Sequence, residues 1–258
     1  NGAHAMRLYT NGNERLRITN SGRINIGDTD QNQNVDQLSV TVGAQNALDN
    51  VARFQSSAAA SGTSETLVKI YKGAGYGGVI SGYITQGSDH GLKFYTANNG
   101  SLSERLRINS NGYVTKPNNP AFIAGRTNGN YTHTPQPFNL NATRLNVGNH
   151  YNTSTYKFTA PVAGVYYFFA QVYYNNGTGS YRVGFRKTPN GGSPFMLTTS
   201  QHAMVGNDNQ QSTSIIESLA IGDTVELYSD QNTAIQCYYN INNGNYGAHT
   251  YFLGYLIG

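Results

Sequence analysis

A five-residue segment occurs twice in this chain of 258 residues. Residues 14–18 and residues 104–108 both read Glu-Arg-Leu-Arg-Ile, at an offset of 90 residues (104 − 14). Upstream, Leu-Tyr-Thr at residues 8–10 corresponds to Phe-Tyr-Thr at residues 94–96. Each copy precedes a turn sequence that ends in glycine, and Asn and Gly supply the positive φ angles that short turns need. Each copy therefore predicts a β-hairpin.

The residue types alternate as they do in a strand with one apolar face. In the first copy, Leu16 and Ile18 are expected on one face, with Arg15 and Arg17 on the other. One hairpin with so small an apolar face is marginal in water. It needs another segment of the chain, or the same hairpin of another chain, as a partner. This need is the first indication of an oligomer.

The composition excludes a mainly helical protein. Charged residues make up only 12% of the chain, about half of the ~25% that is typical of soluble proteins. Glycine and tyrosine are abundant instead, with 30 and 20 residues. Long helices depend on Ala, Leu, Glu, Lys and Arg, whereas aromatic and β-branched residues favour strands. We therefore predict an all-β fold.

Charge and cysteine content exclude several classes of partner. The net charge of +4 is spread thinly, without a basic run, so nucleic acid is not an expected partner. Cys237 is the sole cysteine, which rules out an intrachain disulfide and is ordinary for assembly in a bacterial cytoplasm. No apolar run approaches the ~18 residues of a membrane span, so no membrane insertion is expected. Because Asn1 begins the chain, we expect a fragment of a longer protein or an added leader.

The chain divides at a linker. Residues 116–120 read Lys-Pro-Asn-Asn-Pro, a composition typical of linkers. We predict a shaft domain at residues 1–117, with hairpins at 7–27 and 92–116, and a second domain at residues 118–258. Further short strands are expected in the shaft at residues 38–42, 51–54, 66–71 and 79–84.

The second domain has aromatic-rich strands separated by Asn/Gly turns. They are expected at residues 165–169, 181–185, 225–228 and 251–253, a spacing that suits a sandwich or barrel. About 140 residues are enough to bury one core.

A family resemblance rests on a spaced set of residues in this domain. The set is Asn146, Tyr151, Phe158, Gly164, Tyr166 and Phe168. It resembles, at the family spacing, the signature of the complement globular head among the tumour-necrosis-factor-like jelly rolls. Residues 120–124, 221–227 and 252–257 resemble the family's first, penultimate and closing strands. Phe138 lies one residue further upstream than the signature expects, and Ala170 stands where an aromatic residue is usual. The resemblance implies a ten-stranded antiparallel jelly roll that forms a homotrimer.

The repeated hairpin resembles repeats of bacteriophage tail fibres and related virion proteins. This second resemblance implies a trimeric, hairpin-rich shaft in front of the jelly-roll head. It also implies a virion location, as a tail fibre or spike assembled in the bacterial host cytoplasm. Other virion or tail proteins would then contact the N-terminal side.

No motif in the chain indicates a cofactor or a metal. Asp28, Asp30, Asn32 and Asn34 have the early spacing of an EF-hand loop, but the loop glycine and the final glutamate are missing. A solvated turn explains this segment better. The six histidines are dispersed, without a paired metal spacing. A site between chains on a three-fold axis stays open.

No motif indicates an enzyme either. A nucleophile elbow is missing, and Cys237 lies in a predicted strand, where it is expected to be a buried small residue. Glu217 and Asp223 flank the end of an apolar strand and form the one conceivable glycosidase pair. We expect no catalytic residue and no enzymatic activity.

Recognition by loops is the remaining function. In the complement-head-like fold both termini lie at the base, so the resemblance implies that the far tip is built from residues 126–136, 175–180, 205–211 and 240–249. Candidate receptor-binding residues in these loops are Tyr131, His133, Asn176, Asn207, Asn242, Asn243 and Tyr246. Aromatic rings stack on sugars, and amides hydrogen-bond hydroxyl groups, although the same residues are also ordinary turn residues.

Three functions are weighed. The first is attachment of a homotrimeric head to a host cell-surface glycan or lipopolysaccharide. The second is a structural virion role, as head decoration or a fibre-joining module. The third is a glycan depolymerase.

Overall fold

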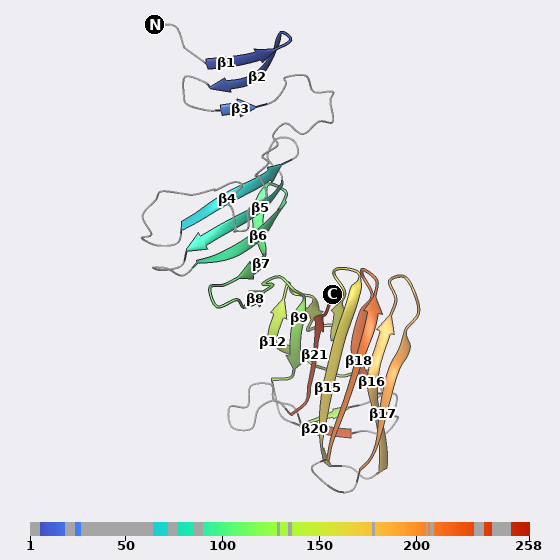
Figure 1. The fold of residues 1–258 in the computed structure, drawn as a ribbon. Helices are drawn as coiled ribbons and strands as arrows, with labels where there is room; N and C mark the ends of the chain where they lie inside the picture. The colour runs from blue at the N-terminus through green and yellow to red at the C-terminus, as the bar shows by residue number, and fades with distance from the viewer. Residues whose placement is uncertain are drawn as a thin grey trace, which may run out of the picture.

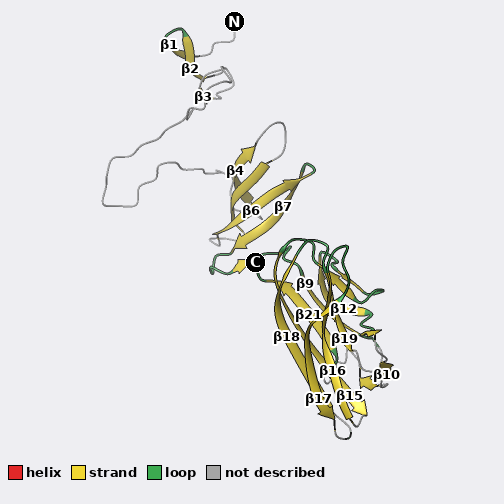
Figure 2. Ribbon diagram, turned by 90° about the vertical axis from the view of Figure 1, so that its right-hand side faces the viewer, coloured by secondary structure: helices red, strands yellow, loops and turns green. Residues whose placement is uncertain are grey.

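The computed structural model describes residues 6–18, 24–26, 64–71, 77–84, 90–127, 130–133, 136–176, 179–204, 206, 209–229, 235–238 and 249–258. Within these ranges all regular secondary structure is β-strand (Figure 2). The strands form four antiparallel sheets. The all-β fold class is therefore confirmed.

The first sheet is the first copy of the repeat (Figure 1). It consists of β1 (Met6–Thr10), β2 (Asn13–Ile18) and β3 (Ile24–Ile26), paired in that order. Asn11 and Gly12 connect β1 to β2 with φ angles of 50° and 78°. Two central residues with positive φ match the right-handed twist of the flanking strands, and Asn-Gly is the preferred pair for such a turn. The upstream segment Leu-Tyr-Thr at residues 8–10 thus belongs to the first strand of the hairpin.

The second sheet contains the second copy and two further strands. Its order is β4 (Ser64–Tyr71), β5 (Gly77–Ile84), β6 (His90–Asn98), β7 (Ser101–Ile108) and β8 (Val114–Thr115). The strands predicted at 66–71 and 79–84 are β4 and β5. Those predicted at 38–42 and 51–54 lie outside the described residues.

The two copies have the same strand register. Leu8 pairs with Leu16 in the first copy, and Phe94 pairs with Leu106 in the second. Equivalent residues of the two copies are 86 positions apart before the turn (95 − 9) and 90 positions apart after it. The difference arises because β6 and β7 each extend two residues further toward the turn than β1 and β2 do. The longer hairpin closes through Asn99 and Gly100, with φ angles of 51° and 83°.

Each copy contains a β-bulge, which changes the faces of the strand on which the arginines lie. In the first copy Leu8 pairs with Leu16 but Tyr9 pairs with Glu14, so the register skips Arg15. One extra residue reverses the sequence of faces, and Glu14 thereby reaches Arg17, with Oε1 to Nε at 2.6 Å. Arg15 instead donates from Nε to Thr10 Oγ1 at 2.9 Å.

The second copy repeats these contacts. Arg107 Nη2 lies 2.7 Å from Glu104 Oε2, and Arg105 Nε donates to Thr96 Oγ1 at 2.7 Å. The prediction that Arg15 and Arg17 share a face in strict alternation was wrong, because a local propensity pattern contains no signal for the bulge.

The C-terminal part is a jelly roll of two facing sheets. The strands are β9 (Ala121–Gly125), β10 (Asn130–His133), β11 (Gln136–Pro137), β12 (Ala142–Val147), β13 (Tyr151–Asn152), β14 (Lys157–Thr159), β15 (Gly164–Asn176), β16 (Gly179–Thr188), β17 (Phe195–Met204), β18 (Asn209–Leu219), β19 (Thr224–Ser229), β20 (Ile235–Tyr238) and β21 (Tyr251–Leu256). The front sheet has the order β12-β9-β21-β15-β18, extended by β10 and β20, and the back sheet has the order β13-β14-β19-β16-β17, extended by β11. The described residues of this part also contain the short strands β10, β11 and β20, so the expected count of ten strands is not confirmed.

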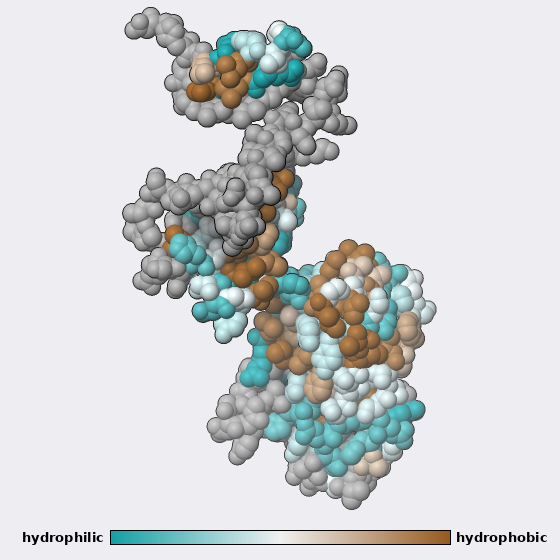
Figure 3. All heavy atoms as spheres, in the orientation of Figure 1, coloured by the Kyte–Doolittle hydropathy of each residue, from teal (hydrophilic) through white to brown (hydrophobic). Residues whose placement is uncertain are grey.

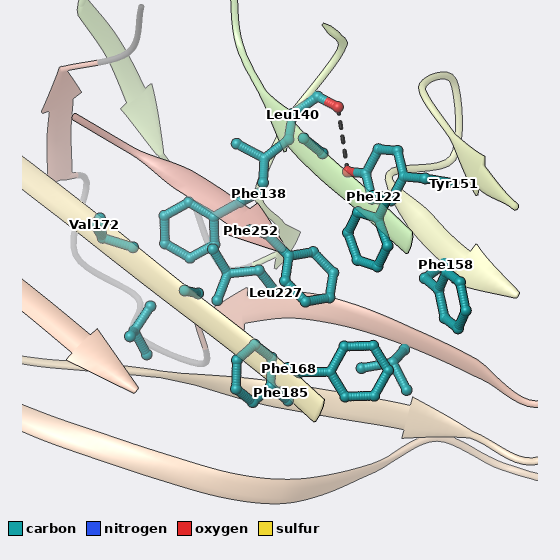
Figure 4. Close-up of a cluster of buried hydrophobic side chains, with 14 of the residues drawn as sticks. Phe122, Phe138, Leu140, Tyr151, Phe158, Phe168, Val172, Phe185, Leu227 and Phe252 are labelled. Carbon is teal, nitrogen blue, oxygen red and sulfur yellow. Dashed lines mark hydrogen bonds between the residues drawn. The ribbon is translucent and has the colours of Figure 1, made fainter. Parts of the chain in front are cut away.

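Aromatic side chains fill the space between the two sheets (Figure 4). Phe122 stacks on Phe158 at 5.1 Å between ring centroids and meets Phe252 edge to face at 4.8 Å. Such pairs add to the stabilisation that burial alone provides. The two departures from the family signature, Phe138 and Ala170, are both buried here.

Two details fix this core. Tyr151 is buried, and its hydroxyl group donates to the Leu140 carbonyl at 3.2 Å (Figure 4). At Gly254 a Cβ atom would lie 2.5 Å from the Phe168 ring and 2.8 Å from the Phe122 ring. Glycine is therefore required for these rings to pack.

The linker contacts both parts of the chain. Asn118 donates from Nδ2 to the Glu104 carbonyl at 2.8 Å, and Asn119 donates to the Leu256 carbonyl at 2.8 Å. No described sheet combines strands from the two sides of this segment. The domain boundary at 117/118 stays a prediction, and these hydrogen bonds describe the segment in which it falls.

Candidate functional site

The outer face of the front sheet, turned away from the core, is apolar and uncharged. Residues that pair across neighbouring strands lie on the same face. Two rows cross it: Leu145, Ile123, Leu253, Phe169 and Ser214, and then Val147, Ala121, Tyr255, Tyr167 and Ile216. A third row consists of Gly125, Tyr251, Gln171 and Ser212. Three adjacent rows without a charged residue are unusual for a surface that stays in water.

Several side chains of this face are open to solvent. Ile216 is 62% exposed and Tyr255 is 44% exposed. Figure 3 shows hydrophobic residues gathered on this side of the head in the half nearer the shaft, with more hydrophilic residues toward the lower end. Exposed apolar patches of this kind mark surfaces that bind a protein or a ligand.

Aromatic pairs follow the junction of β15 and β21 along this face. Tyr167 lies 5.5 Å from Tyr255 between ring centroids, and Phe169 lies 5.8 Å from Tyr251. Burial and the neighbouring Tyr167 raise the pKa of Tyr251 above its usual value, so this phenol stays neutral. The face therefore presents rings without charge.

The sequence analysis missed this face as a functional surface. A strand with one solvated face alternates polar and apolar residues, but residues 165–169 read Val-Tyr-Tyr-Phe-Phe without interruption. A continuous apolar run is typical of a strand that is covered on both faces. That signal was present in the sequence.

The strand ends show where the predicted tip loops lie. At one end of the head, Gly164 pairs with Leu219, and Leu256 donates its backbone N–H to the Pro120 carbonyl. At the other end, strand pairs join Tyr174 to Asn209, Gly179 to Met204 and Tyr251 to Gly125. The four predicted loops all adjoin this second end. It is the end away from the linker and the C-terminus (Figure 1).

The predicted receptor-binding residues are only partly described. Tyr131 and His133 lie in β10, where their backbones pair with Cys237 and Ile235 of β20. Asn176 is the last residue of β15. The side chains of these residues, and the whole of Asn207, Asn242, Asn243 and Tyr246, lie outside what the structure describes. The receptor-binding set stays a prediction.

The carboxylates considered as a glycosidase pair have a common cationic partner. Lys187 Nζ lies 3.3 Å from Glu217 Oε1 and 3.1 Å from Asp223 Oδ2. Asp223 also accepts backbone N–H groups of Asn190 and Ala220, each at 3.0 Å. Burial alone would raise the pKa of Asp223, but these donors and Lys187 outweigh it and hold the pKa below its usual value. Asp223 therefore stabilises the turn between β18 and β19.

A second buried carboxylate lies on the outer side of the back sheet. Glu226 is 1% exposed and pairs with Arg186 and with Lys157, whose Nζ is 3.5 Å away. The Arg186 guanidinium carbon lies 3.7 Å from the centroid of the Tyr228 ring. Removing one member would leave a buried charge without compensation. The arrangement suits a structural role.

Within the described ranges, no three His, Cys, Asp or Glu side chains cluster as metal ligands. The calcium-loop-like segment at residues 28–34 lies outside these ranges. The described part of the chain also contains no helix long and apolar enough to cross a membrane.

The fold and this uncharged sheet face define a class, the jelly-roll domains of the complement and tumour-necrosis-factor type. The C1q domain family model matches residues 121–257, more than half of the chain, and the chain belongs to this family. Domains of the C1q/TNF family form homotrimers and often bind ligands. A comparison with curated proteins gives no match.

Solved structures of this type are similar to the chain. The globular domain of zebrafish complement 1qA protein is 21% identical, with a TM-score of 0.42, and the similarity covers 54% of this chain and 98% of that one. The Eiger TNF structure from S. frugiperda is 12% identical, with a TM-score of 0.47 and coverages of 55% and 94%. Murine APRIL at pH 5.0 is 14% identical, with a TM-score of 0.41 and coverages of 54% and 98%.

Proposed function

We propose that this chain is part of a homotrimeric bacteriophage tail fibre or spike. Its C1q-like head would attach to the host cell surface, to polysaccharide or lipopolysaccharide. The N-terminal side would join other virion proteins, and the protein would be found in the virion after assembly in the bacterial cytoplasm.

The observation that carries this proposal is the uncharged outer face of the front sheet. Ile216 and Tyr255 stand exposed on it beside Tyr167 and Phe169. Removing apolar surface from water contributes about 25 cal/mol of favourable free energy per Å². Burial of this face would therefore favour self-association. A three-fold axis close to this face would bury it in all three chains at once.

The repeated hairpin supports the fibre part of the proposal. The two copies share the bulge at Arg15 and Arg105 and the same arginine–glutamate contacts. A unit that recurs along one chain before a terminal domain suits a shaft that carries a head. The resemblance of this unit to tail-fibre repeats supplies the bacteriophage context.

The end of the head opposite the linker is the proposed attachment surface. It carries the loops with Tyr131, His133, Asn176, Asn207 and Tyr246, together with Asn242 and Asn243. Three weak sugar sites in one trimer would act together, so that avidity replaces tight binding at each site.

The trimer is tested by sedimentation of Ile216→Lys against Ile221→Lys. Ile216 is 62% exposed on the front-sheet face, whereas Ile221 is 64% exposed in the turn before β19. We expect the first substitution to weaken the trimer by at least tenfold, because it buries a charge in the interface, and the second to leave it unchanged. A monomeric wild-type chain at micromolar concentration, or equal behaviour of the two variants, would contradict the proposal.

Attachment is tested by binding of the purified chain to host cells and by competition with infection. We expect Tyr131→Ala combined with Tyr246→Ala to abolish binding while the trimer stays intact. Unchanged binding by this double variant would exclude these loops as the attachment surface.

The second candidate function is a structural virion module whose head only joins three chains. This candidate is favoured because two of the few carboxylates of the head, Glu226 and Asp223, are buried and form ion pairs within the chain. A stable trimer that neither binds host cells nor competes with infection would select this candidate. Release of reducing ends from host polysaccharide would instead indicate a depolymerase, the third candidate.

A further inference from the structure

A cavity of about 330 Å³ lies beside the linker, where the shaft meets the head. Its lining comes from three parts of the chain. Arg105 of β7 lines it from the shaft, Lys116 from the linker, and His150 and Leu256 from the head. In Figure 1 this linker connects β8 to β9. A ligand in the cavity would therefore contact the shaft, the linker and the head at once.

Hydrogen bonds join the walls of this cavity. Asn118 donates to the Glu104 carbonyl in the shaft, and Asn119 donates to the Leu256 carbonyl in the head, each at 2.8 Å. Leu256 in turn donates its backbone N–H to the Pro120 carbonyl at 3.0 Å. All of these residues except Glu104 line the cavity. The cavity is therefore bounded by segments that are bonded to one another.

Two cationic side chains line the cavity without a carboxylate partner. Arg105 is the bulge residue of the second copy, and its Nε atom donates to the neutral Thr96 hydroxyl group at 2.7 Å. Arg107, on the opposite face of the strand, pairs with Glu104 instead. In the described part of the chain neither Arg105 nor Lys116 forms an ion pair, and none of the lining residues is acidic. Like charges repel each other, so an anion bound here would remove an unfavourable interaction.

His150 adds a hydrogen-bond donor without a charge. Burial lowers the pKa of His150 below its usual value, so the ring is neutral at pH 7 and carries one N–H group. The ring packs against Gly148, which has a φ angle of 74° and at which a Cβ atom would lie 2.3 Å from His150 Nε2. The cavity thus combines two positive charges with one neutral donor.

Another wall of the cavity is apolar. It includes Pro161, Val162 and Leu256, of which Val162 is 44% exposed. Sites for small molecules combine apolar walls with a few polar groups, and they occupy about 300–1,000 Å³. This cavity lies at the lower end of that range, so a ligand that fills it is small. A bare inorganic ion would leave the apolar wall uncovered.

We propose that this cavity binds a small organic anion, in which a carboxylate or phosphate group is carried on a body about the size of one sugar ring. The oxyanion group lies between Arg105 and Lys116, because guanidinium and ammonium groups form charge-assisted hydrogen bonds with such groups. The body of the ligand covers the apolar wall, and the ring N–H of His150 is available to one of its hydroxyl groups. This site is distinct from the loops at the other end of the head.

Isothermal titration calorimetry on the full-length chain tests the class of ligand. The probes are glucuronate and glucose 6-phosphate, which combine an oxyanion with a sugar ring, glucose, which lacks the charge, and inorganic phosphate, which lacks the body. We expect at least one of the charged sugars to bind at least about tenfold more tightly than glucose and than inorganic phosphate, because charged hydrogen bonds and apolar burial both contribute. The tighter of the two identifies the oxyanion.

Three results of this titration would overturn the proposal. Glucose that binds as tightly as the charged sugars would exclude a requirement for the oxyanion. Inorganic phosphate that binds as tightly would indicate an adventitious ion only. Absence of binding by both charged sugars would exclude the site altogether.

A pair of double variants tests the residues. Arg105→Gln with Lys116→Gln removes both charges of the cavity, and we expect the charged sugar to bind at least about tenfold more weakly. Arg15→Gln with Arg182→Gln is the matched control, because it changes the net charge equally outside the cavity. Arg15 makes the same kind of contact with threonine as Arg105 does, and Arg182 is exposed on the back sheet. Equal loss in both double variants would show attraction to the overall charge and would overturn the site.

Limited proteolysis of the wild-type chain locates the bound ligand without any substitution. A ligand that bridges shaft, linker and head stabilises the joint between them, so we expect a saturating charged sugar to slow cleavage at residues 113–119 by at least about fivefold. Cleavage at the tip of the first hairpin, residues 10–13, should stay unchanged. Binding without protection of residues 113–119 would place the ligand elsewhere and overturn the inference. These measurements require neither the trimer nor host cells, so their failure is distinguishable from failure of the proposed function.

Discussion

The head and the shaft use the same antiparallel alternation but cover their apolar faces differently. In the head a second sheet lies against the first, and Phe122 and Phe168 are buried at 1% and 0% exposure. In the shaft a single sheet leaves Phe94 half-buried and Ile70 at 61% exposure. A period-two pattern therefore specifies a face but not what covers it. The head completes its core within one chain, whereas the described residues of the shaft leave apolar side chains such as Ile70 partly exposed.

The largest effect is expected from truncating the centre of the head core. Phe168→Ala removes a ring that contacts the rings of Phe122, Phe158, Phe185 and Phe252. We expect a loss of about 3–5 kcal/mol in the free energy of unfolding of the head, measured by urea denaturation at fixed protein concentration.

Phe94→Ala in the shaft is the comparison for this variant. At protein concentrations too low for association, its cost should be much smaller, because Phe94 is only half-buried within one chain. Equal losses from the two variants would mean that the shaft sheet is covered within the chain, and the contrast between the two regions would disappear.

The next effect concerns the close packing that only the head has. Gly254→Ala places a methyl group against the Phe168 and Phe122 rings, and we expect a cost of about 1–3 kcal/mol from overpacking. Gly82→Ala is the control in the shaft, since a Cβ atom there meets nothing within 4 Å. Thermal unfolding followed by near-ultraviolet circular dichroism measures both.

The stability of the head is expected to depend on pH through Asp223. The pKa of Asp223 is held below its usual value, so its contribution to stability is present above the unfolded pKa and is lost as pH falls through the lower folded pKa. We expect Asp223→Asn to destabilise the head by about 1–3 kcal/mol at pH 7. It should also flatten the fall in the free energy of unfolding as the pH drops below about 4, the usual pKa of an aspartate. A pH profile parallel to that of the wild type would contradict this role of Asp223.

The smallest effect is expected at the linker. Asn118→Ala removes an exposed hydrogen bond to the shaft. We expect it to lower the free energy of unfolding by about 0.5–1.5 kcal/mol. Asn119→Ala removes the part-buried bond to the head. If Asn118 acts only on the shaft, protease sensitivity should rise before residue 116 and stay unchanged after residue 121. Cleavage first within the head would show that the two regions are coupled.

Much of the fold could be predicted from the sequence because its signals are local. The hairpin turns follow from Asn and Gly in the connections, and aromatic strands such as residues 165–169 indicate a sandwich or barrel. The jelly roll was implied by the family resemblance, which residues such as Tyr151 and Phe158 carry. The bulge at Arg15 could not be predicted, because it depends on which residues oppose one another across two strands. The apolar outer face of the front sheet could have been predicted, since a strand without polar alternation already indicates burial on both faces. The proposed sugar-binding residues depend on loop geometry, which no residue pattern specifies.

The two copies of the hairpin also indicate how a repeated unit of this kind can change. The second copy is longer by four residues, two on each strand, and its tip still closes through Asn and Gly. Because side chains alternate with a period of two, adding two residues to each strand preserves every side chain's face, whereas adding one would turn the new tip over. Arms of different length can therefore arise without disturbing the rows below them. The hairpin tip is a place where sequence can be inserted in steps of four, by evolution or by design, while the scaffold stays the same.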